Sequence, residues 1–575
     1  MEQKAADLGE TIQTVRKAVQ ATPENHPSRA GRLHNLGHLL GDRYSRTGAM
    51  ADLKEAIQIA LQAVEATQQD HPRRARRLNN LGRLLSHRYT RTGAMVDLDE
   101  ALHLSLTALN LRVSPAGKGA FAAIQMLETS CGVLMGSLYD LRTDVSALEK
   151  SRPDLARTFI SLRDRLDSPA FRSPLQATAK DPISTERREG DQRREAAAQL
   201  EIVCRAAEHG PIVIVNASSH RCDALIVDHS GIRSLELPRL SRKDLERKEP
   251  QSLDTLIWLW DTIVGPVLNE LGLAQAVADS EPQHIWWIPI GPLVRFPLHA
   301  AGNHLSDHPD TALDRVVSSY SSSIRAIIHG RQQRFASLTA NRKVALVTME
   351  DTPGLGHLDF AREETDRVRA VCASMRIDAT EPGLGKKEVL SALETCWMFH
   401  FAGHSMTHPA NPLQSQLLLK DWKEDPLTVA SLLDTNLGPR SLFIAYLSAC
   451  GTGQVGKKEL VDEGIHLTAA YQLADFRHVI GTLWSVDDRL CVDMARMVYE
   501  FLQIEGVQSN GMSDEAVSRA LHYAMRALRD RWRTQMEGGS NVGRPATEGK
   551  RDAVIYDEEV GKTAALWVPY VHFGV

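Results

Sequence analysis

The chain has 575 residues, which is too long for a single hydrophobic core and predicts two to four domains. Hydrophobic residues make up 43% of it and charged residues 24%, as in ordinary soluble globular proteins, and its net charge of -5 gives no reason to expect nucleic acid or an acidic membrane as a partner. The seven cysteines form no CxxC pair, the N-terminus has no signal sequence, and no apolar run is long enough to span a membrane. These features predict a cytoplasmic protein from a reducing compartment.

Residues 1–166 have the pattern of repeated helices. The segment His26–Met50 returns as His71–Met95, 45 residues later, and apolar residues recur every three or four positions within each copy. Each unit is therefore predicted to be a pair of amphipathic helices, with a period longer than the roughly 34 residues of a usual tetratricopeptide repeat. Four arginines at equivalent positions are expected to form a solvated face or pairs within a repeat rather than a binding site: Arg43, Arg46, Arg88 and Arg91.

Residues 167–200 are predicted to be a flexible linker, because prolines, serines and mixed charges replace large apolar residues there. Beyond it, residues 201–340 alternate apolar strands with a helix at Leu253–Leu273 and a strand at Ile285–Ile290, which predicts an α/β layer. His299 in this region has no partner cysteine at a matching turn, so a packed, structural role is expected for it.

Residues 341–575 are predicted to form a second α/β segment. A strand at Lys343–Met349 precedes helices at Ala361–Ala373 and Lys386–Glu394, and a further apolar strand then leads to His404. This βαβαβ pattern predicts parallel strands with right-handed crossovers. The expected fold class is an α-helical repeat array followed by an α/β domain.

His404 and Cys450 each follow an apolar strand at a turn that contains glycine. If the two strands are parallel neighbours, both side chains reach the same edge of the sheet. An imidazole beside a thiol can take its proton and later return it to a leaving amine, so the pair is a candidate thiol protease dyad. The backbone N–H groups of Cys450 and Ser405 are the natural donors to an oxyanion. The alternative is a small buried cysteine and a satisfied polar histidine.

Two other patterns at this site suggest ligands. The segment Gly451–Lys457 has the spacing of a phosphate-binding loop, but Lys458 stands where a hydroxyl must bind Mg²⁺, which argues against a nucleotide. His400, His404 and His408 have the four-residue spacing of metal ligands on a helix. Because this segment is predicted to be a strand and a turn, no metal site and no cofactor are expected.

Several motifs resemble the CHAT family, peptidases of the caspase and separase clan that are often fused to tetratricopeptide repeats. The motifs are HFAGHS around His404, LSACGTG around Cys450, FRHVIGTLWSVDD (Phe476–Asp488), IWWIPIGPLVRFPLHAAGNH (Ile285–His304), the SSY motif at Ser318–Tyr320 and the closing WVPYVHFG (Trp567–Gly574). The resemblance covers nearly the whole chain and is to the fungal version of such proteins.

The resemblance implies two caspase-like halves, with residues 201–340 lacking the dyad and 341–575 carrying it. It also implies that Asp488, or Asp487 beside it, is the acid at the base of the S1 pocket, which would favour Arg or Lys at P1. Asp462 and Glu463 are alternative acids, and a helix N-terminus stabilised by negative charge explains them equally well.

The expected function is a cysteine endopeptidase regulated through its helical repeats, which would bind a protein partner. As the resemblance implies, such peptidases act in immune or cell-death pathways, and some cleave gasdermin-like pore-forming proteins. Ser405 departs from the family pattern, in which glycine follows the catalytic histidine, and its side chain crowds the oxyanion site. The alternative is therefore a pseudo-protease that acts as an interaction scaffold.

Overall fold

The computed structural model describes two compact units, Met1–Val203 and Cys204–Val575, and each is considered by itself. The described residues are 2–24, 26–68, 71, 73–92, 96–97, 100–101, 104, 201–217, 221–273, 282–306, 310–332, 342–408, 412–435, 442–449, 467–474, 476–508, 512–537, 565 and 567–575. Within them, no helix combines the length and the apolar character that a membrane crossing requires.

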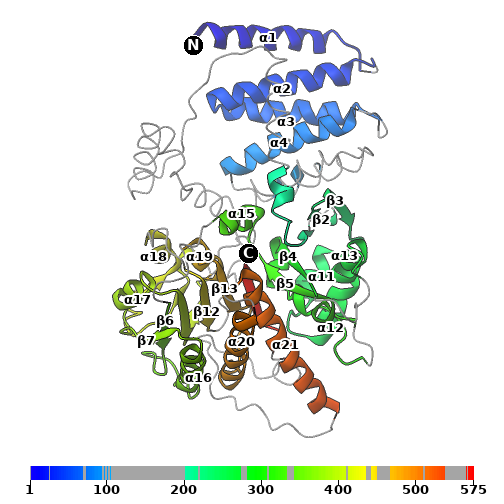
Figure 1. Ribbon diagram of the computed structural model, residues 1–575. Helices are drawn as coiled ribbons and strands as arrows, with labels where there is room; N and C mark the ends of the chain where they lie inside the picture. Colours follow the sequence, from blue (N-terminus) through cyan, green and yellow to red (C-terminus); the bar gives the residue numbers. More distant parts are fainter. Residues whose placement is uncertain are drawn as a thin grey trace. The chain divides into compact units, whose positions relative to one another are not determined.

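The first unit is a stack of helices, drawn in blue in Figure 1. Its described helices are α1 (Glu2–Gln20), α2 (Arg29–Thr47), α3 (Met50–Glu65) and α4 (Arg74–Thr92). Gly48 ends α2 in a left-handed conformation, with φ of 68°, and its N–H donates to the Tyr44 carbonyl. The predicted helix pairs and their 45-residue repeat are confirmed.

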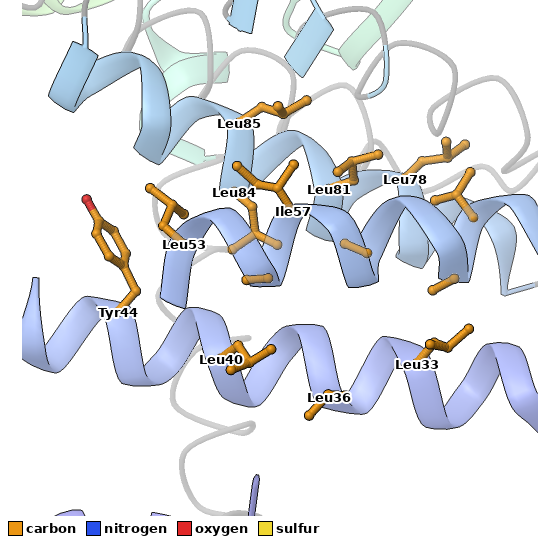
Figure 2. Packing of buried hydrophobic residues seen from close by; sticks show 14 of the residues in the cluster. Leu33, Leu36, Leu40, Tyr44, Leu53, Ile57, Leu78, Leu81, Leu84 and Leu85 are labelled. Carbon is orange, nitrogen blue, oxygen red and sulfur yellow. The ribbon is translucent and has the colours of Figure 1, made fainter. Parts of the chain in front are cut away.

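Apolar residues at helical spacing form one core between these helices (Figure 2). Leu33, Leu36 and Leu40 of α2 lie opposite Leu53 and Ile57 of α3, all of them less than a tenth exposed. On the other side of α3, α4 contributes Leu78, Leu81, Leu84 and Leu85. Each helix therefore buries its apolar stripe against the next one.

The same ion pair occurs in both repeats. Arg43 Nη2 lies 2.5 Å from Asp52 Oδ1, and Arg88 Nη2 lies 2.5 Å from Asp97 Oδ1. In each pair the Nε also donates to the second carboxylate oxygen, so both contacts are bidentate. Pairing within the repeat, one of the two roles predicted for these arginines, is thus confirmed for Arg43 and Arg88.

The second unit is built on an eleven-stranded sheet in the order β3-β2-β1-β4-β5-β14-β13-β12-β8-β6-β7. Its strands are β1 (Ile212–Ala217), β2 (Cys222–Asp228), β3 (Gly231–Glu236), β4 (Gln283–Pro289), β5 (Val316–Tyr320), β6 (Lys343–Thr348), β7 (Asp378–Thr380), β8 (Met398–Ala402), β12 (Ile444–Ser448), β13 (His478–Thr482) and β14 (Tyr570–Gly574). A separate small sheet contains β9 (Ser405–Met406), β10 (Gln416–Leu417) and β11 (Leu427–Thr428).

Helices surround this sheet (Figure 1). The described α-helices are α11 (Arg242–Arg247), α12 (Leu253–Leu259), α13 (Gly265–Glu270), α14 (Ala312–Arg315), α15 (Ile324–Gln332), α16 (Ala361–Ser374), α17 (Lys386–Leu393), α18 (Val429–Asp434), α19 (Leu467–Leu473), α20 (Asp488–Gln508) and α21 (Asp514–Glu537). The helix predicted at Leu253–Leu273 is interrupted by a π-helical turn, Trp260–Val264, where the Gly265 N–H donates to the carbonyl of Trp260. Pro266 follows directly and has no N–H for the regular ladder, which accounts for the change in pitch.

The predicted βαβαβ segment is confirmed. Strand β6 pairs in parallel with β7 on one side and with β8 on the other, and helices α16 and α17 connect them. Strand β12 then pairs in parallel with β8, in a register that sets Ser448 opposite Ala402. The strands that precede His404 and Cys450 are therefore parallel neighbours.

Strand β14, red in Figure 1, lies in the middle of the sheet. It runs antiparallel to β13 and parallel to β5, and its five residues are all buried. It thereby joins the strands that precede residue 340 to those that follow it. No local pattern in the sequence predicts this insertion.

A histidine relay crosses the sheet at β14 and consists of Asp514, His478, His572, Ser319 and His284. The Nε2 of His478 donates to Asp514 Oδ1 at 3.0 Å, and the Nε2 of His572 donates to Nδ1 of His478 at 3.0 Å. Ser319 Oγ lies 2.6 Å from both His572 Nδ1 and His284 Nε2, so it donates to the first and accepts from the second. Four neighbouring strands and the start of α21 are linked in this way, and each imidazole is neutral with one proton.

Candidate active site

His404 lies just beyond the end of β8. Gly403 precedes it and donates its N–H to the Ser448 carbonyl at 3.2 Å, which continues the pairing with β12. A Cβ at Gly403 would lie 2.7 Å from the Phe401 ring and 2.8 Å from Met349 Cβ, so only glycine fits there. The chain can therefore turn tightly between the strand and the histidine.

A backbone carbonyl orients the His404 ring. The Nε2 of His404 lies 3.1 Å from the carbonyl oxygen of Gly356, and the side chain is buried. Since a carbonyl only accepts, Nε2 must carry the proton in the neutral ring, and Nδ1 is the basic nitrogen. This tautomer can act as a base through Nδ1 while Nε2 stays anchored.

The loop that carries Gly356 connects β6 to α16 and is held at several points. The indole N–H of Trp422 donates to the Pro353 carbonyl at 3.0 Å, and the Phe360 N–H donates to Asp488 Oδ2 at 2.9 Å. These bonds hold the loop at Pro353 and at Phe360, on either side of Gly356. Gly356 could not be predicted from the sequence as a partner of His404, because the position of a backbone carbonyl does not depend on the residue type.

Cys450 lies outside the described residues, and the geometry of the dyad stays a prediction. The described chain reaches Ala449, whose carbonyl accepts a 2.8 Å hydrogen bond from the hydroxyl of Thr482 in β13. Residue 449 is thus attached to the same end of the sheet at which His404 lies, one residue before the cysteine. The segment Gly451–Lys457, Asp462 and Glu463 also lie outside the described residues.

Ser405 belongs to the small sheet. It begins β9, pairs with Leu417 of β10, and is only 3% exposed. In addition, the N–H of Leu418 donates to the His404 carbonyl at 2.9 Å. The backbone on both sides of the histidine is therefore fixed by sheet pairing, and the extended conformation at Ser405 suits a residue with a side chain.

Asp487 and Asp488 lie at the start of α20. Asp487 caps the helix by accepting a 3.1 Å bond from the Leu490 N–H, and it is half-buried. The Asp488 side chain is 2% exposed, and one carboxylate oxygen is bound by Phe360 N–H as described above. The acid therefore contacts the end of the loop that orients His404.

The other histidines of the sequence motifs have different surroundings. His400, inside β8, lies 3.1 Å from Glu364 and 3.3 Å from the hydroxyl of Tyr499, and all three residues are fully buried. His299 has Nδ1 2.8 Å from the Tyr320 hydroxyl and Nε2 2.9 Å from the Val568 carbonyl, and burial lowers its pKa to about 4. The packed, structural role predicted for His299 is confirmed.

Two other cysteines of this unit, Cys372 and Cys396, are too deeply buried to act as nucleophiles. Burial raises the pKa of Cys372 and of Cys396 to about 12, so both thiols are protonated at neutral pH. Neither can supply a thiolate nucleophile under these conditions.

Comparisons with known protein families agree with the division into helical repeats and an α/β domain. The model of the CHAT domain family matches residues 253–574, and a tetratricopeptide repeat model matches residues 29–73 and 74–115. The chain thus combines tetratricopeptide repeats with an α/β domain of the caspase-like cysteine peptidase class. It belongs to the CHAT domain family.

Among solved structures, the chain is similar to one in the crystal structure of the Saccharomyces cerevisiae separase–securin complex, with 9% sequence identity and a TM-score of 0.42. The similarity covers 98% of this chain and 48% of that one, so the chain spans about half the length of the chain it matches. The comparison with curated proteins finds no match.

Proposed function

We propose that this protein is a cysteine endopeptidase in which Cys450 is the nucleophile and His404 the general acid and base. The observation that carries the proposal is the register of β8 and β12, which sets Ala402 opposite Ser448. The histidine comes two residues after Ala402 and the cysteine two residues after Ser448. In parallel neighbouring strands, these positions lie at one edge of the sheet.

In the proposed reaction, Nδ1 of His404 takes the thiol proton of Cys450, and the thiolate attacks the carbonyl carbon of the scissile peptide bond. The N–H groups of Ser405 and Cys450 donate to the oxyanion that forms. The imidazolium then protonates the leaving amine, and a water molecule hydrolyses the acyl-enzyme by the reverse sequence of proton transfers. Anchoring of Nε2 by the Gly356 carbonyl supports this role, because it keeps Nδ1 as the base.

For specificity, we propose a basic P1 residue recognised by an acidic S1 pocket. Asp488 is the first choice of acid, because its carboxylate lies against the loop that orients His404. Asp487, Asp462 and Glu463 are the alternatives. A buried carboxylate that pairs with Arg or Lys of the substrate would give a strong preference over neutral P1 residues.

At the level of the cell, the proposed role is proteolysis in an immune or cell-death pathway in the cytoplasm, with gasdermin-like proteins as the proposed class of substrate. The tetratricopeptide repeats support regulation by a protein partner. The second candidate function is a pseudo-protease scaffold, which the side chain of Ser405 beside the oxyanion site favours.

The test is covalent labelling of the full chain with acyloxymethyl ketone probes that carry Arg or Asp at P1. The Arg probe is expected to label the wild type, and Cys450→Ala and His404→Ala are expected to abolish the labelling. His408→Ala is the matched control, since it removes a histidine from the same segment without touching the dyad. Labelling that survives in Cys450→Ala would refute the assignment of the nucleophile, and a folded protein that no probe labels would favour the scaffold.

A further inference from the structure

Gln416 in β10 carries a buried amide group close to the candidate active site. Strand β10 is the middle strand of the small sheet, and Gln416 pairs with Met406 of β9 on one side and with Thr428 of β11 on the other. The residue is only 6% exposed. Because the main chain of a middle strand is engaged with both neighbours, the side chain is the part of Gln416 that is available for a further contact.

The side chain of Gln416 lies on the same face of the small sheet as that of His404. Residues directly opposite each other in an antiparallel pair point to the same face, and so do alternate residues along one strand. Met406 lies opposite Gln416, and His404 precedes Met406 by two positions. The bond from the Leu418 N–H to the His404 carbonyl extends the pairing to the histidine. Diagonal neighbours of this kind are about 7–8 Å apart, within reach of a long side chain.

The amide oxygen of Gln416 has no hydrogen-bond partner within the part of the chain that the structure describes. Its polar neighbours in the small sheet differ in this respect. The Ser415 hydroxyl accepts the His408 N–H at 3.1 Å. The Thr428 hydroxyl accepts the Ser431 N–H, also at 3.1 Å. A buried acceptor without a partner costs free energy, because it has lost its water and gained nothing in return, and a ligand that donates to it recovers that cost.

We propose that Gln416 binds the main chain of the substrate next to the scissile peptide bond. A carboxamide has a carbonyl that accepts and an NH₂ group that donates, both at the end of the side chain. In an extended peptide, the N–H and C=O of one residue point to the same side and match these two groups whatever the side chain is. Gln416 thus holds the substrate beside His404 without selecting its sequence. The inference rests on the proposed function, because it places a peptide substrate at that site.

The test measures peptide binding to the full chain with Cys450→Ala, so that nothing is cleaved. The probe is a fluorescein-labelled hexapeptide of alanines with one arginine at its fourth position, and binding is followed by fluorescence anisotropy. Gln416→Met removes the amide and keeps the length of the side chain, so we expect it to weaken binding about three- to tenfold. Since an apolar side chain suits the buried position, stability against urea should stay equal or rise.

Gln472→Met is the matched control. Gln472 is also buried, at 4% exposure, and neither polar atom of its amide has a partner among the described residues. It lies near the end of α19, shortly before β13 begins, and therefore at the opposite end of the parallel strands from His404. Its substitution should leave peptide binding nearly unchanged. Equal weakening in both variants, or a marked loss of stability in Gln416→Met, would overturn the proposal.

Ester analogues of the probe identify the main-chain partner. In each of three peptides, one N–H at position two, three or four is replaced by an ester oxygen. One ester should bind more weakly than the parent peptide when Gln416 is present, and it should lose nothing further in Gln416→Met. Losses that are the same in both proteins for every ester would overturn the proposal, as would failure of the parent peptide to bind. Because binding is measured without cleavage, these outcomes are separate from the covalent labelling that tests the peptidase activity.

Discussion

A single proton position decides whether His404 can work as a base. The Gly356 carbonyl places that proton on Nε2, and this carbonyl belongs to a loop whose end is bound by the Asp488 carboxylate. His404 and Cys450 could be predicted as candidates from the strands that precede them, because apolar runs ending at glycine are local patterns. The hydrogen bond that orients His404 could not be predicted, because it comes from a backbone atom 48 positions earlier.

Asp488→Asn separates the two roles that this residue can have. The amide oxygen of asparagine can still accept the Phe360 N–H, but the negative charge is lost. If Asp488 is the S1 acid, kcat/KM for a P1-Arg substrate should fall by at least about tenfold, while a P1-neutral substrate is little affected. Measuring kcat/KM for both substrates checks this. An equal fall for both would assign Asp488 to positioning of the loop instead.

Gly574→Ala should destabilise the α/β unit. A Cβ there would lie 2.6 Å from Nδ1 of His478 and 2.7 Å from Nε2 of His572, where the two imidazoles meet. Because neither buried ring can move without breaking the histidine relay, we expect a loss of about 1–3 kcal/mol in the free energy of unfolding, measured with urea. Gly506→Ala in α20 is the control, since its Cβ would be in ordinary contact. Unchanged stability in Gly574→Ala would show that the rings are not packed as described.

At the scale of secondary structure elements, the histidine relay should make stability depend on pH. Burial lowers the pKa of His284, His478 and His572, and for His284 the nearby Arg331 lowers it further. In the unfolded chain these groups have a pKa of about 6.5 and take up protons below that pH, whereas the folded protein does not. Stability should therefore be unaffected by these groups at high pH and fall as the pH drops below about 6.5.

Each such histidine contributes a slope of about 1.4 kcal/mol per pH unit in that range. Urea unfolding at pH 7.5 and pH 5.5 measures the total, to which His522 near the relay adds, because burial lowers its pKa as well. The variant His284→Gln keeps a donor for Ser319 and removes one titrating group, so its slope should be smaller than that of the wild type. An identical slope would show that His284 does not contribute to the pH dependence of the free energy of unfolding.

The elements themselves were largely predictable. Strands β6, β8 and β12 and helices α16 and α17 follow from apolar runs and helical spacing, and the repeat helices follow from a visible internal duplication. Strand β3 was missed, because its residues, Gly231–Glu236, alternate poorly and only one of them is buried. The segment of β5 was noted in the sequence only as the SSY motif, and no neighbouring strand was predicted for it.

At the scale of the whole molecule, β14 is the strand that unites the sheet. Removing residues 567–575 should leave β5 and β13 without a partner at the centre of the sheet. It would also take the side chains of Trp567, Tyr570 and Phe573 out of the core, where each is at most 5% exposed. We expect the α/β unit to lose cooperative unfolding and become sensitive to limited proteolysis. The point variant Val571→Pro should act in the same direction, because proline cannot donate in a central strand, and Val571→Thr is its control. A truncated protein that resists proteolysis as the wild type does would contradict this role.

The position of β14 could not be predicted, because pairing between strands far apart in the sequence has no local signal. The closing motif is visibly a strand, but nothing in it tells which neighbours it takes. That residues 201–340 and 341–575 are two caspase-like halves, of which only the second carries the dyad, stays a prediction. In the sheet itself, the two are continuous through β14.

The central place of β14 also affects how the protein is made. The ribosome completes β5 at Tyr320 and reaches Tyr570 only after every other strand of the sheet has emerged. At roughly 5–20 residues per second, that interval lasts tens of seconds. During this time the edges of β5 and β13 are open, so the nascent chain is exposed to aggregation and is a natural client for chaperones. For the same reason, the complete sheet that holds the candidate dyad cannot form before β14 has been synthesised, which delays any proteolytic activity until then.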